Sequence, residues 1–306
     1  MPIIDFFGYV PHEAAASFVM ESVIQQEGYP ETFGSGLAKN LHLDAGLLDN
    51  LSTSKNKLER FDQLKKQLKY RLSAEESVRK QKEIGVQHSV VFCTAPEEAR
   101  LLSKFDSFII PFLALDPLNS EGVAIALDAI ENDEVAGLCL TPFVSGIPPD
   151  DERYSAIYEV CETRGLPIWI HCSANRKPNS SNYLGHPKNI EKVAMEYPKL
   201  KIVAGHGGWP WLHEMVMLAW NYENIYIDIS AHRPKYMEKS GSGWEPLLNY
   251  GQTVIRNKVL FGSAWQLMAI SQESIIQEIL ALDLSDETKE RWLYKNAAEL
   301  LAIPIN

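Results

Sequence analysis

Two histidines lie where predicted β-strands end, and their type and position favour acid/base chemistry. His171 falls near the end of the apolar run 166–172, and His206 closes the run 200–206, which two glycines follow. In a barrel of parallel strands, catalytic groups collect at the carboxyl ends of the strands. Imidazole exchanges a proton readily near neutral pH. The two histidines therefore predict a shared site at one end of a barrel.

The elements that would position these histidines alternate between strands and helices along the whole chain. Most of the predicted strands are continuous apolar runs, as expected for strands buried on both faces. A capping-box pattern of Ser73 and Glu76 opens one helix, and a long amphipathic helix is predicted at 285–303. Eight strands separated by helices predict an α/β fold, a (β/α)8 TIM barrel. A doubly wound open sheet is the alternative, but no GxGxxG motif follows the first strand. The predicted strands cover residues 2–7, 86–93, 106–115, 135–141, 166–172, 200–206, 224–230 and 258–264.

A single domain is predicted for residues 1–306. Residues 10–85 are too many for one connection between a strand and its helix, so we expect a helical insertion near the barrel mouth. The loops 142–152, 173–187 and 231–246 are rich in proline, glycine, serine and asparagine. Because they follow the fourth, fifth and seventh strands, we expect them to line the same mouth.

Composition narrows the classes of partner. The chain has 306 residues, 45% hydrophobic and 23% charged, and a formal net charge of −11. This balance argues against nucleic acid and anionic membranes as partners. Four widely spaced cysteines without a CxxC pair predict buried thiols in a reducing compartment. No signal peptide or long apolar span is recognisable in the sequence, so a cytoplasmic location is predicted.

The segment 185–230 resembles the amidohydrolase-related family of the amidohydrolase superfamily. It contains the motifs KIVAGHGGWPW and IYIDIS, and KVLFGSA (258–264) and LYKNAAELLAI (293–303) are similar to the family's eighth strand and closing helix. The branch includes aminocarboxymuconate-semialdehyde and resorcylate decarboxylases, oxalomesaconate hydratase and pyrone-dicarboxylate lactonase. The resemblance covers nearly the whole chain, and it implies the barrel fold and a small-molecule substrate. Members often form homodimers, although the sequence identifies no interface.

The resemblance also implies a metal site of which this sequence retains only a part. The family pattern is Asp-x-His-x-His on the first strand, one histidine ending each of strands five and six, and an aspartate after strand eight. Here Asp5 is followed by Phe7 and Tyr9 in place of the two histidines, and Ala264 replaces the aspartate. Only His171 and His206 match as histidine ligands, and a basic residue common on strand four is Cys139. A catalytic zinc needs about three protein ligands, so we predict a site without a metal or other cofactor.

The predicted site residues follow from these positions. His171 and His206 are the predicted catalytic residues, and four residues are predicted to bind substrate. Tyr9 could donate a hydrogen bond or fill space, and Trp265 could stack on a flat substrate or fill the volume of the lost metal. Arg176 could pair with a carboxylate or belong to the surface, and His232 and Arg233 have the same two interpretations. The substrate-binding set is Tyr9, Arg176, Trp209 and Trp265.

Three functions follow from this site. The first is a metal-independent hydrolase or lyase that uses acid/base catalysis on an aromatic or unsaturated small molecule. The pyrone-dicarboxylate lactonase branch is similar in that it hydrolyses its substrate without a metal. The second is a non-catalytic ligand-binding protein. The third is a metal-dependent enzyme with rebuilt ligands, for which His12, Glu13 and Asp5 are candidates. Cys139 is a further candidate nucleophile, but a buried thiol is the favoured interpretation.

Overall fold

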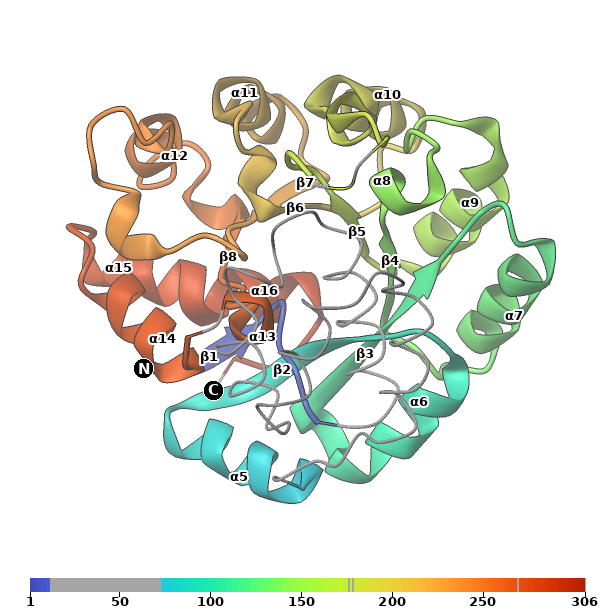
Figure 1. Ribbon diagram of the computed structural model, residues 1–306, viewed down its shortest axis with the longest axis horizontal. Helices are drawn as coiled ribbons and strands as arrows, with labels where there is room; N and C mark the ends of the chain where they lie inside the picture. Colours follow the sequence, from blue (N-terminus) through green and yellow to red (C-terminus); the bar gives the residue numbers. More distant parts are fainter. Residues whose placement is uncertain (12–72, 176, 178, 269, 306) are drawn as a thin grey trace, which may run out of the picture.

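The computed structural model describes residues 1–11, 73–175, 177, 179–268 and 270–305. Eight parallel strands lie in the order β1 to β8, and each pairs with the next along the chain. Figure 1 shows them curled into a ring with helices on the outside. The strands are β1 (Ile3–Asp5), β2 (Val86–Cys93), β3 (Ile109–Leu115), β4 (Gly137–Leu140), β5 (Ile168–His171), β6 (Ile202–Gly205), β7 (Ile225–Asp228) and β8 (Val259–Leu260).

Backbone hydrogen bonds just beyond the first and last strands join the two edges of the sheet. The N–H of Phe6 donates to the carbonyl of Phe261 at 2.8 Å, and the N–H of Ala264 donates to the carbonyl of Phe7 at 2.9 Å. The predicted α/β barrel is therefore confirmed.

Strand alternation separates the apolar side chains into two cores. The inner core fills the barrel and is rich in aromatic rings. The outer core lies between the strands and the helices, where Ile170 and Ala204 point away from the inner Trp169 and Val203. The inner side chains include Ile4, Phe6, Phe7, Val90, Phe92, Ile110, Phe112, Cys139, Trp169, Val203 and Leu260.

The described helices cover the outside of the strands (Figure 1). The predicted cap is present, since the Ser73 hydroxyl accepts a hydrogen bond from the N–H of Glu76 at 3.1 Å. The long C-terminal helix forms in three consecutive pieces, the middle one a π-helix, and ends at residue 300. No helix among the described residues is long and apolar enough to cross a membrane. The α-helices are α5 (Ala74–Glu83), α6 (Pro96–Leu102), α7 (Ser120–Glu131), α8 (Pro142–Ser145), α9 (Ser155–Arg164), α10 (Pro187–Glu196), α11 (Leu212–Asn221), α12 (Glu245–Tyr250), α13 (Trp265–Met268), α14 (Gln272–Leu280), α15 (Asp286–Glu290) and α16 (Asn296–Leu300). The shorter turns are η1 (Ser103–Phe108), η2 (Glu152–Tyr154), η3 (Asn182–Gly185), η4 (His206–Gly208), η5 (Pro234–Tyr236), η6 (Arg256–Lys258) and the π-helix η7 (Arg291–Lys295).

β1 and β8 are shorter than predicted, and Asp5 provides a reason for both. Its buried carboxylate accepts hydrogen bonds from the backbone N–H groups of Phe7 at 3.1 Å and Ser263 at 2.7 Å. The Ser263 hydroxyl and the Gln272 amide at 2.7 Å also donate to it. Because the backbone N–H groups of Phe7 and Ser263 donate to Asp5, they are not available to pair with a neighbouring strand. The same bonds hold the chain in place where it leaves β1 and β8.

The predicted insertion at 10–85 falls mostly outside the described residues. The structure describes 10–11 and the segment from 73, where α5 begins. Residues 12–72, with His12 and Glu13, lie outside the described part, so the predicted helical cover over the mouth stays a prediction.

Candidate active site

His171 and His206 lie beside each other at the carboxyl ends of β5 and β6. His171 is the last residue of β5 and pairs with Gly205, the residue before His206. The two ring centroids are 5.0 Å apart and the rings are nearly perpendicular, at 77°. Both side chains are buried, at 8% and 7% exposure. The structure therefore brings the two sequence-predicted histidines into one site.

The backbone at the end of β6 allows aromatic rings to approach His206 closely. His206 has a φ of +64°, in the left-handed region that non-glycine residues rarely adopt. On one side of it, a Cβ at Gly205 would lie 2.1 Å from the Trp169 ring. On the other side, a Cβ at Gly207 would lie 2.5 Å from the Trp244 ring. Positions 205 and 207 therefore require glycine, because the Trp169 and Trp244 rings leave no room for a Cβ atom. The left-handed backbone of His206 between them is typical of functional sites.

A chain of hydrogen bonds connects His206 to a buried carboxylate at the end of β7. His206 Nδ1 and Ser230 Oγ are 2.8 Å apart, and the Ser230 hydroxyl donates a short hydrogen bond to Asp228 Oδ2. The same carboxylate accepts from Trp169 Nε1 at 2.9 Å and from the backbone N–H of Ser230 at 3.0 Å. We refer to Asp228, Ser230 and His206 as the relay.

Counting hydrogens in the relay assigns the tautomer of His206. An ionised carboxylate only accepts, and a serine hydroxyl has one hydrogen. Because Ser230 gives its hydrogen to Asp228, its oxygen must accept from His206, so Nδ1 carries the hydrogen and Nε2 is unprotonated. This is the arrangement of an imidazole base oriented by a neighbouring acid.

Burial sets the charge states of these groups. It raises the pKa of Asp228 to about 6, against the opposing effect of hydrogen bonds from Ser230 and Trp169. Burial also lowers the pKa of His171 to about 4 and holds the pKa of His206 well below its usual range. At neutral pH the site therefore has two neutral imidazoles and one ionised carboxylate.

Aromatic rings enclose the histidines. The Phe7 ring lies 5.4 Å from the His206 ring, 4.6 Å from Phe92 and 5.3 Å from Trp169. The Phe143 ring lies 4.5 Å from that of His171. Phe7, predicted from the sequence as a replaced ligand, is thus in direct contact with the retained histidine.

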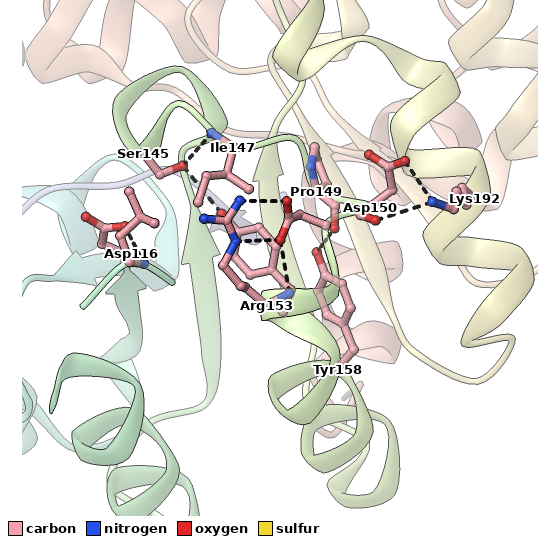
Figure 2. Close-up of polar contacts among 11 residues, drawn as sticks. Asp116, Ser145, Ile147, Pro149, Asp150, Arg153, Tyr158 and Lys192 are labelled. Carbon is pink, nitrogen blue, oxygen red and sulfur yellow. Dashed lines mark hydrogen bonds and ion pairs between the residues drawn. The ribbon is translucent and has the colours of Figure 1, made fainter. Parts of the chain in front are cut away.

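The loops after β4 and β5 are joined and hold Phe143 in place. The Ser180 hydroxyl donates to the Phe143 carbonyl at 2.8 Å, and Lys177 Nζ donates to the Val144 carbonyl at 3.2 Å. Figure 2 shows how the first of these loops is anchored further along: Tyr158 donates to the Pro149 carbonyl at 2.6 Å, and Lys192 pairs with Asp150 at 3.2 Å. The loops 142–152 and 173–187 are therefore in contact with each other.

His232 is a third histidine near this site, for which the sequence left both substrate binding and a surface position open. Its ring centroid lies 5.7 Å from Trp209 and 4.8 Å from Trp244, and burial lowers its pKa to about 4. It is close enough that its positive charge would depress the pKa values of both His171 and His206. The sequence also missed the relay, although the Asp-x-Ser spacing that ends β7 was a usable signal.

The other predicted substrate-binding residues are placed differently from the histidines. Tyr9 and Trp265 pack on each other with ring centroids 5.6 Å apart, both buried in the outer core. Trp209 borders His232, and its indole N–H donates to the Ser242 carbonyl at 3.2 Å. Arg176 lies outside the described residues. Arg233 forms a bidentate ion pair with Glu278 of α14, so its charge is already paired.

All four cysteines are free and buried, as predicted. Burial raises the pKa of the Cys139 thiol, which lies in the inner core. A protonated thiol is a poor nucleophile, and this supports the buried-thiol interpretation.

Comparisons with known proteins agree with this architecture. A family model described as amidohydrolase matches residues 56–303. The chain belongs to the amidohydrolase family. A comparison with curated proteins finds no significant match.

Solved structures share the fold of this amidohydrolase at low sequence identity. An uncharacterised TIM-barrel protein from Bordetella bronchiseptica has a TM-score of 0.68 at 18% identity, over 99% of both chains. The 5-carboxyvanillate decarboxylase from Sphingomonas paucimobilis has a TM-score of 0.60 at 16% identity, also over 99% of both chains. A 5-carboxyvanillate decarboxylase from Novosphingobium aromaticivorans, complexed with manganese, has a TM-score of 0.60 at 15% identity, covering 98% of this chain and 96% of that one.

The described residues of this amidohydrolase do not fit a divalent metal at the barrel mouth. Phe7 and Ala264 lack donor atoms, and the oxygens of Asp5 accept four hydrogen bonds from their neighbours. No group of three or more His, Cys, Asp or Glu side chains that could hold a metal occurs in the described ranges. Among the described residues, the mouth offers two imidazoles, fewer than the three or more protein ligands of a catalytic site.

Proposed function

We propose that this amidohydrolase is a metal-independent hydrolase or carbon–carbon lyase that acts on an aromatic or unsaturated small molecule by acid/base catalysis. Family membership supports a hydrolase- or lyase-type enzyme. The observation that carries the proposal is the relay, which orients one imidazole and places a buried carboxylate behind it, with a second imidazole 5.0 Å away.

The proposed base is Nε2 of His206. It accepts a proton from water or from an acidic group of the substrate, and the ring becomes an imidazolium. Nδ1–H then donates a stronger hydrogen bond to Ser230, which donates in turn to the Asp228 carboxylate. The negative charge of Asp228 stabilises the imidazolium, which later returns the proton to the product or leaving group. His171 is the second proton carrier of the proposal.

The rings around the histidines support a flat substrate. Phe7, Phe143 and Trp169 are the aromatic residues in ring contact with His171 or His206 among the described residues. Aromatic surfaces favour offset or edge contacts with a planar ligand. Similar structures include decarboxylases of substituted benzoates, which makes an aromatic acid the first substrate class to test.

A non-catalytic ligand-binding protein is the second candidate. The packing of the Phe7 ring against the His206 ring favours it, because Phe7 occupies space beside the imidazole that a reacting substrate would need. A metal-dependent enzyme with rebuilt ligands is the third candidate, through His12 and Glu13. The roles of Tyr9, Arg176, Trp209 and Trp265, a homodimer and a cytoplasmic location all stay predictions.

The test combines metal analysis with activity. Untagged protein purified without chelator is analysed for Zn, Mn, Fe, Co and Ni, then assayed with 2,6-dihydroxybenzoate, 5-carboxyvanillate and a pyrone lactone after treatment with a chelator. The proposal expects turnover of at least one compound by metal-free protein. His206→Gln should lower kcat by about 10²–10⁴-fold, the usual contribution of a general base. Ser230→Ala should lower it less, and His213→Gln, an exposed control, should leave it unchanged.

Two outcomes would reject the metal-independent enzyme. Turnover that appears only after manganese is added would favour rebuilt ligands. Tight binding of one of the acids without turnover, unchanged in His206→Gln, would favour the ligand-binding protein.

A further inference from the structure

A second cavity lies at the amino-terminal end of the barrel, opposite the histidines. Its volume is about 680 Å³, and it is lined by residues at the starts of the strands, among them His88, Ala136 and Lys201. The C-terminal segment 300–304 forms another side of it. In barrels of this kind the active site lies at the other end, so this cavity is separate from the relay and its aromatic surroundings.

The charged side chains that line this cavity are both basic. They are Lys201 and Arg164, with His88 beside them, and no aspartate or glutamate is among the described lining residues. This is unusual for a chain whose formal net charge is −11. A cavity whose walls carry one sign of charge concentrates ions of the opposite sign.

Lys201 is the group with the most unused binding capacity. Its ammonium donates one hydrogen bond, to the Leu300 carbonyl at 2.8 Å, and forms no ion pair with the described residues. An ammonium has three donors, so two remain for a ligand. Lys201 is half-buried, and this partial burial lowers the pKa of its ammonium.

The two other basic groups are held in fixed positions. Arg164 donates to the Ile130 carbonyl at 2.9 Å and to Asp133 at 2.9 Å. His88 Nδ1 lies 2.6 Å from the Ser107 carbonyl, which can only accept, so this nitrogen carries a hydrogen. Between the basic groups the walls are apolar and include Ile110, Pro167 and Ile303.

We propose that this cavity binds an organic carboxylate with an apolar body. The carboxylate would lie against the Lys201 ammonium, and the apolar body would pack on the strand starts and the C-terminal segment. A half-buried ammonium recognises a carboxylate through charge-assisted hydrogen bonds. The apolar walls suit an apolar body better than they suit a fully hydrated inorganic anion.

The test is calorimetric titration of the full chain with octanoate, with 1-octanol as a neutral analogue of equal length and with inorganic phosphate. Octanoate should bind, and octanol and phosphate should bind at least tenfold more weakly. Lys201→Met should weaken octanoate binding at least tenfold. Ala136→Leu, which keeps the charge but fills part of the cavity, should also weaken it and so guards against a folding defect in the first variant.

Lys258→Met is the matched control. Lys258 is also partly buried, donates to a backbone carbonyl, that of Glu223, and has its pKa lowered by burial, but it does not line the cavity. Its loss should leave octanoate binding unchanged, and so should His206→Gln at the other end of the barrel. The proposal is overturned if octanoate does not bind, if octanol or phosphate binds as tightly as octanoate, or if Lys201→Met leaves octanoate binding unchanged. Loss of binding in His206→Gln would also overturn it, because octanoate would then occupy the other end of the barrel.

Discussion

Acidification from pH 7 to pH 5 should destabilise this protein through three histidines at the barrel mouth. Desolvation lowers the pKa of His171 and of His232 from 6.5 to about 4, and holds that of His206 well below its usual range. The folded pKa lies below the unfolded one in each case. The stability that each neutral ring contributes is therefore complete above about pH 6.5 and is lost as the pH falls towards the folded pKa.

The size of the effect follows from these shifts. A histidine with these two pKa values loses about 2 kcal/mol of stability between pH 7 and pH 5. His171 and His232 together lose about 4 kcal/mol, and His206 adds to that loss. Asp228 acts in the opposite direction, because its folded pKa of about 6 is above the usual value of 3.8. It takes up a proton on the way to pH 5 and returns only about 1 kcal/mol, so the histidines dominate.

The expected net loss of about 3 kcal/mol from His171, His232 and Asp228 is a large part of the 5–15 kcal/mol typical of a folded protein. Burial also raises the pKa of Asp5, which opposes the loss from His206. Guanidinium unfolding followed by tryptophan fluorescence at pH 5, 6 and 7 measures it. His232→Gln should reduce the pH-dependent loss by about 2 kcal/mol, whereas the exposed control His213→Gln should leave it unchanged. Equal unfolding free energies at pH 5 and pH 7, or the same pH dependence in His232→Gln as in wild type, would refute the reasoning.

Two further substitutions test the packing and the relay. Gly205→Ala would place a methyl group 2.1 Å from the Trp169 ring. A hydrogen bond from the Trp169 indole to Asp228 holds that ring in place, so the free energy of unfolding should fall by about 1–3 kcal/mol. An unchanged unfolding midpoint would contradict this contact. Asp228→Asn should cost about 1–3 kcal/mol, because the amide nitrogen that replaces one carboxylate oxygen must face a donor, either the backbone N–H of Ser230 or the indole N–H of Trp169. An unchanged free energy of unfolding would contradict these contacts.

The fold was predictable because each of its elements has a local signal. Continuous apolar runs marked the strands, and the Ser73 cap marked the start of α5. The strand ends were less predictable, because they depend on contacts between distant residues. Asp5 shortens β1 and β8 through hydrogen bonds to residues 258 and 267 positions away, which no local pattern contains.

The proximity of His171 and His206 was predictable from the fold alone, since both end neighbouring strands. The neighbours of each ring were not. Tyr9 was expected at the mouth because of its spacing from Asp5, yet the chain turns at Phe7 and Tyr9 packs on Trp265 in the outer core. The surroundings of His232 had no local signal, because its ring packs against Trp209 from another segment and against Trp244, twelve positions further along its own loop.

The mouth of the barrel is divided between two kinds of side chain. At the ends of β5, β6 and β7 lie His171 and the relay, whose three residues are connected by hydrogen bonds. Beyond the ends of β1 and β8 lie Phe7 and Ala264, which have no polar atom in their side chains. Ala264 nevertheless has a φ of +45°, a conformation that aspartate and asparagine tolerate better than alanine.

The backbone on the β8 side therefore has a shape suited to a polar residue, although the side chain at this position is apolar. The Ala264 N–H donates to the Phe7 carbonyl at 2.9 Å, which keeps the two edges of the barrel together. Because this contact uses backbone atoms alone, it does not depend on the side chain at position 264. In the proposed reaction, a flat substrate would meet imidazoles on one side and an aromatic ring on the other. Restoring Ala264→Asp alone should then not create a metal site, because Phe7 would still lie against His206.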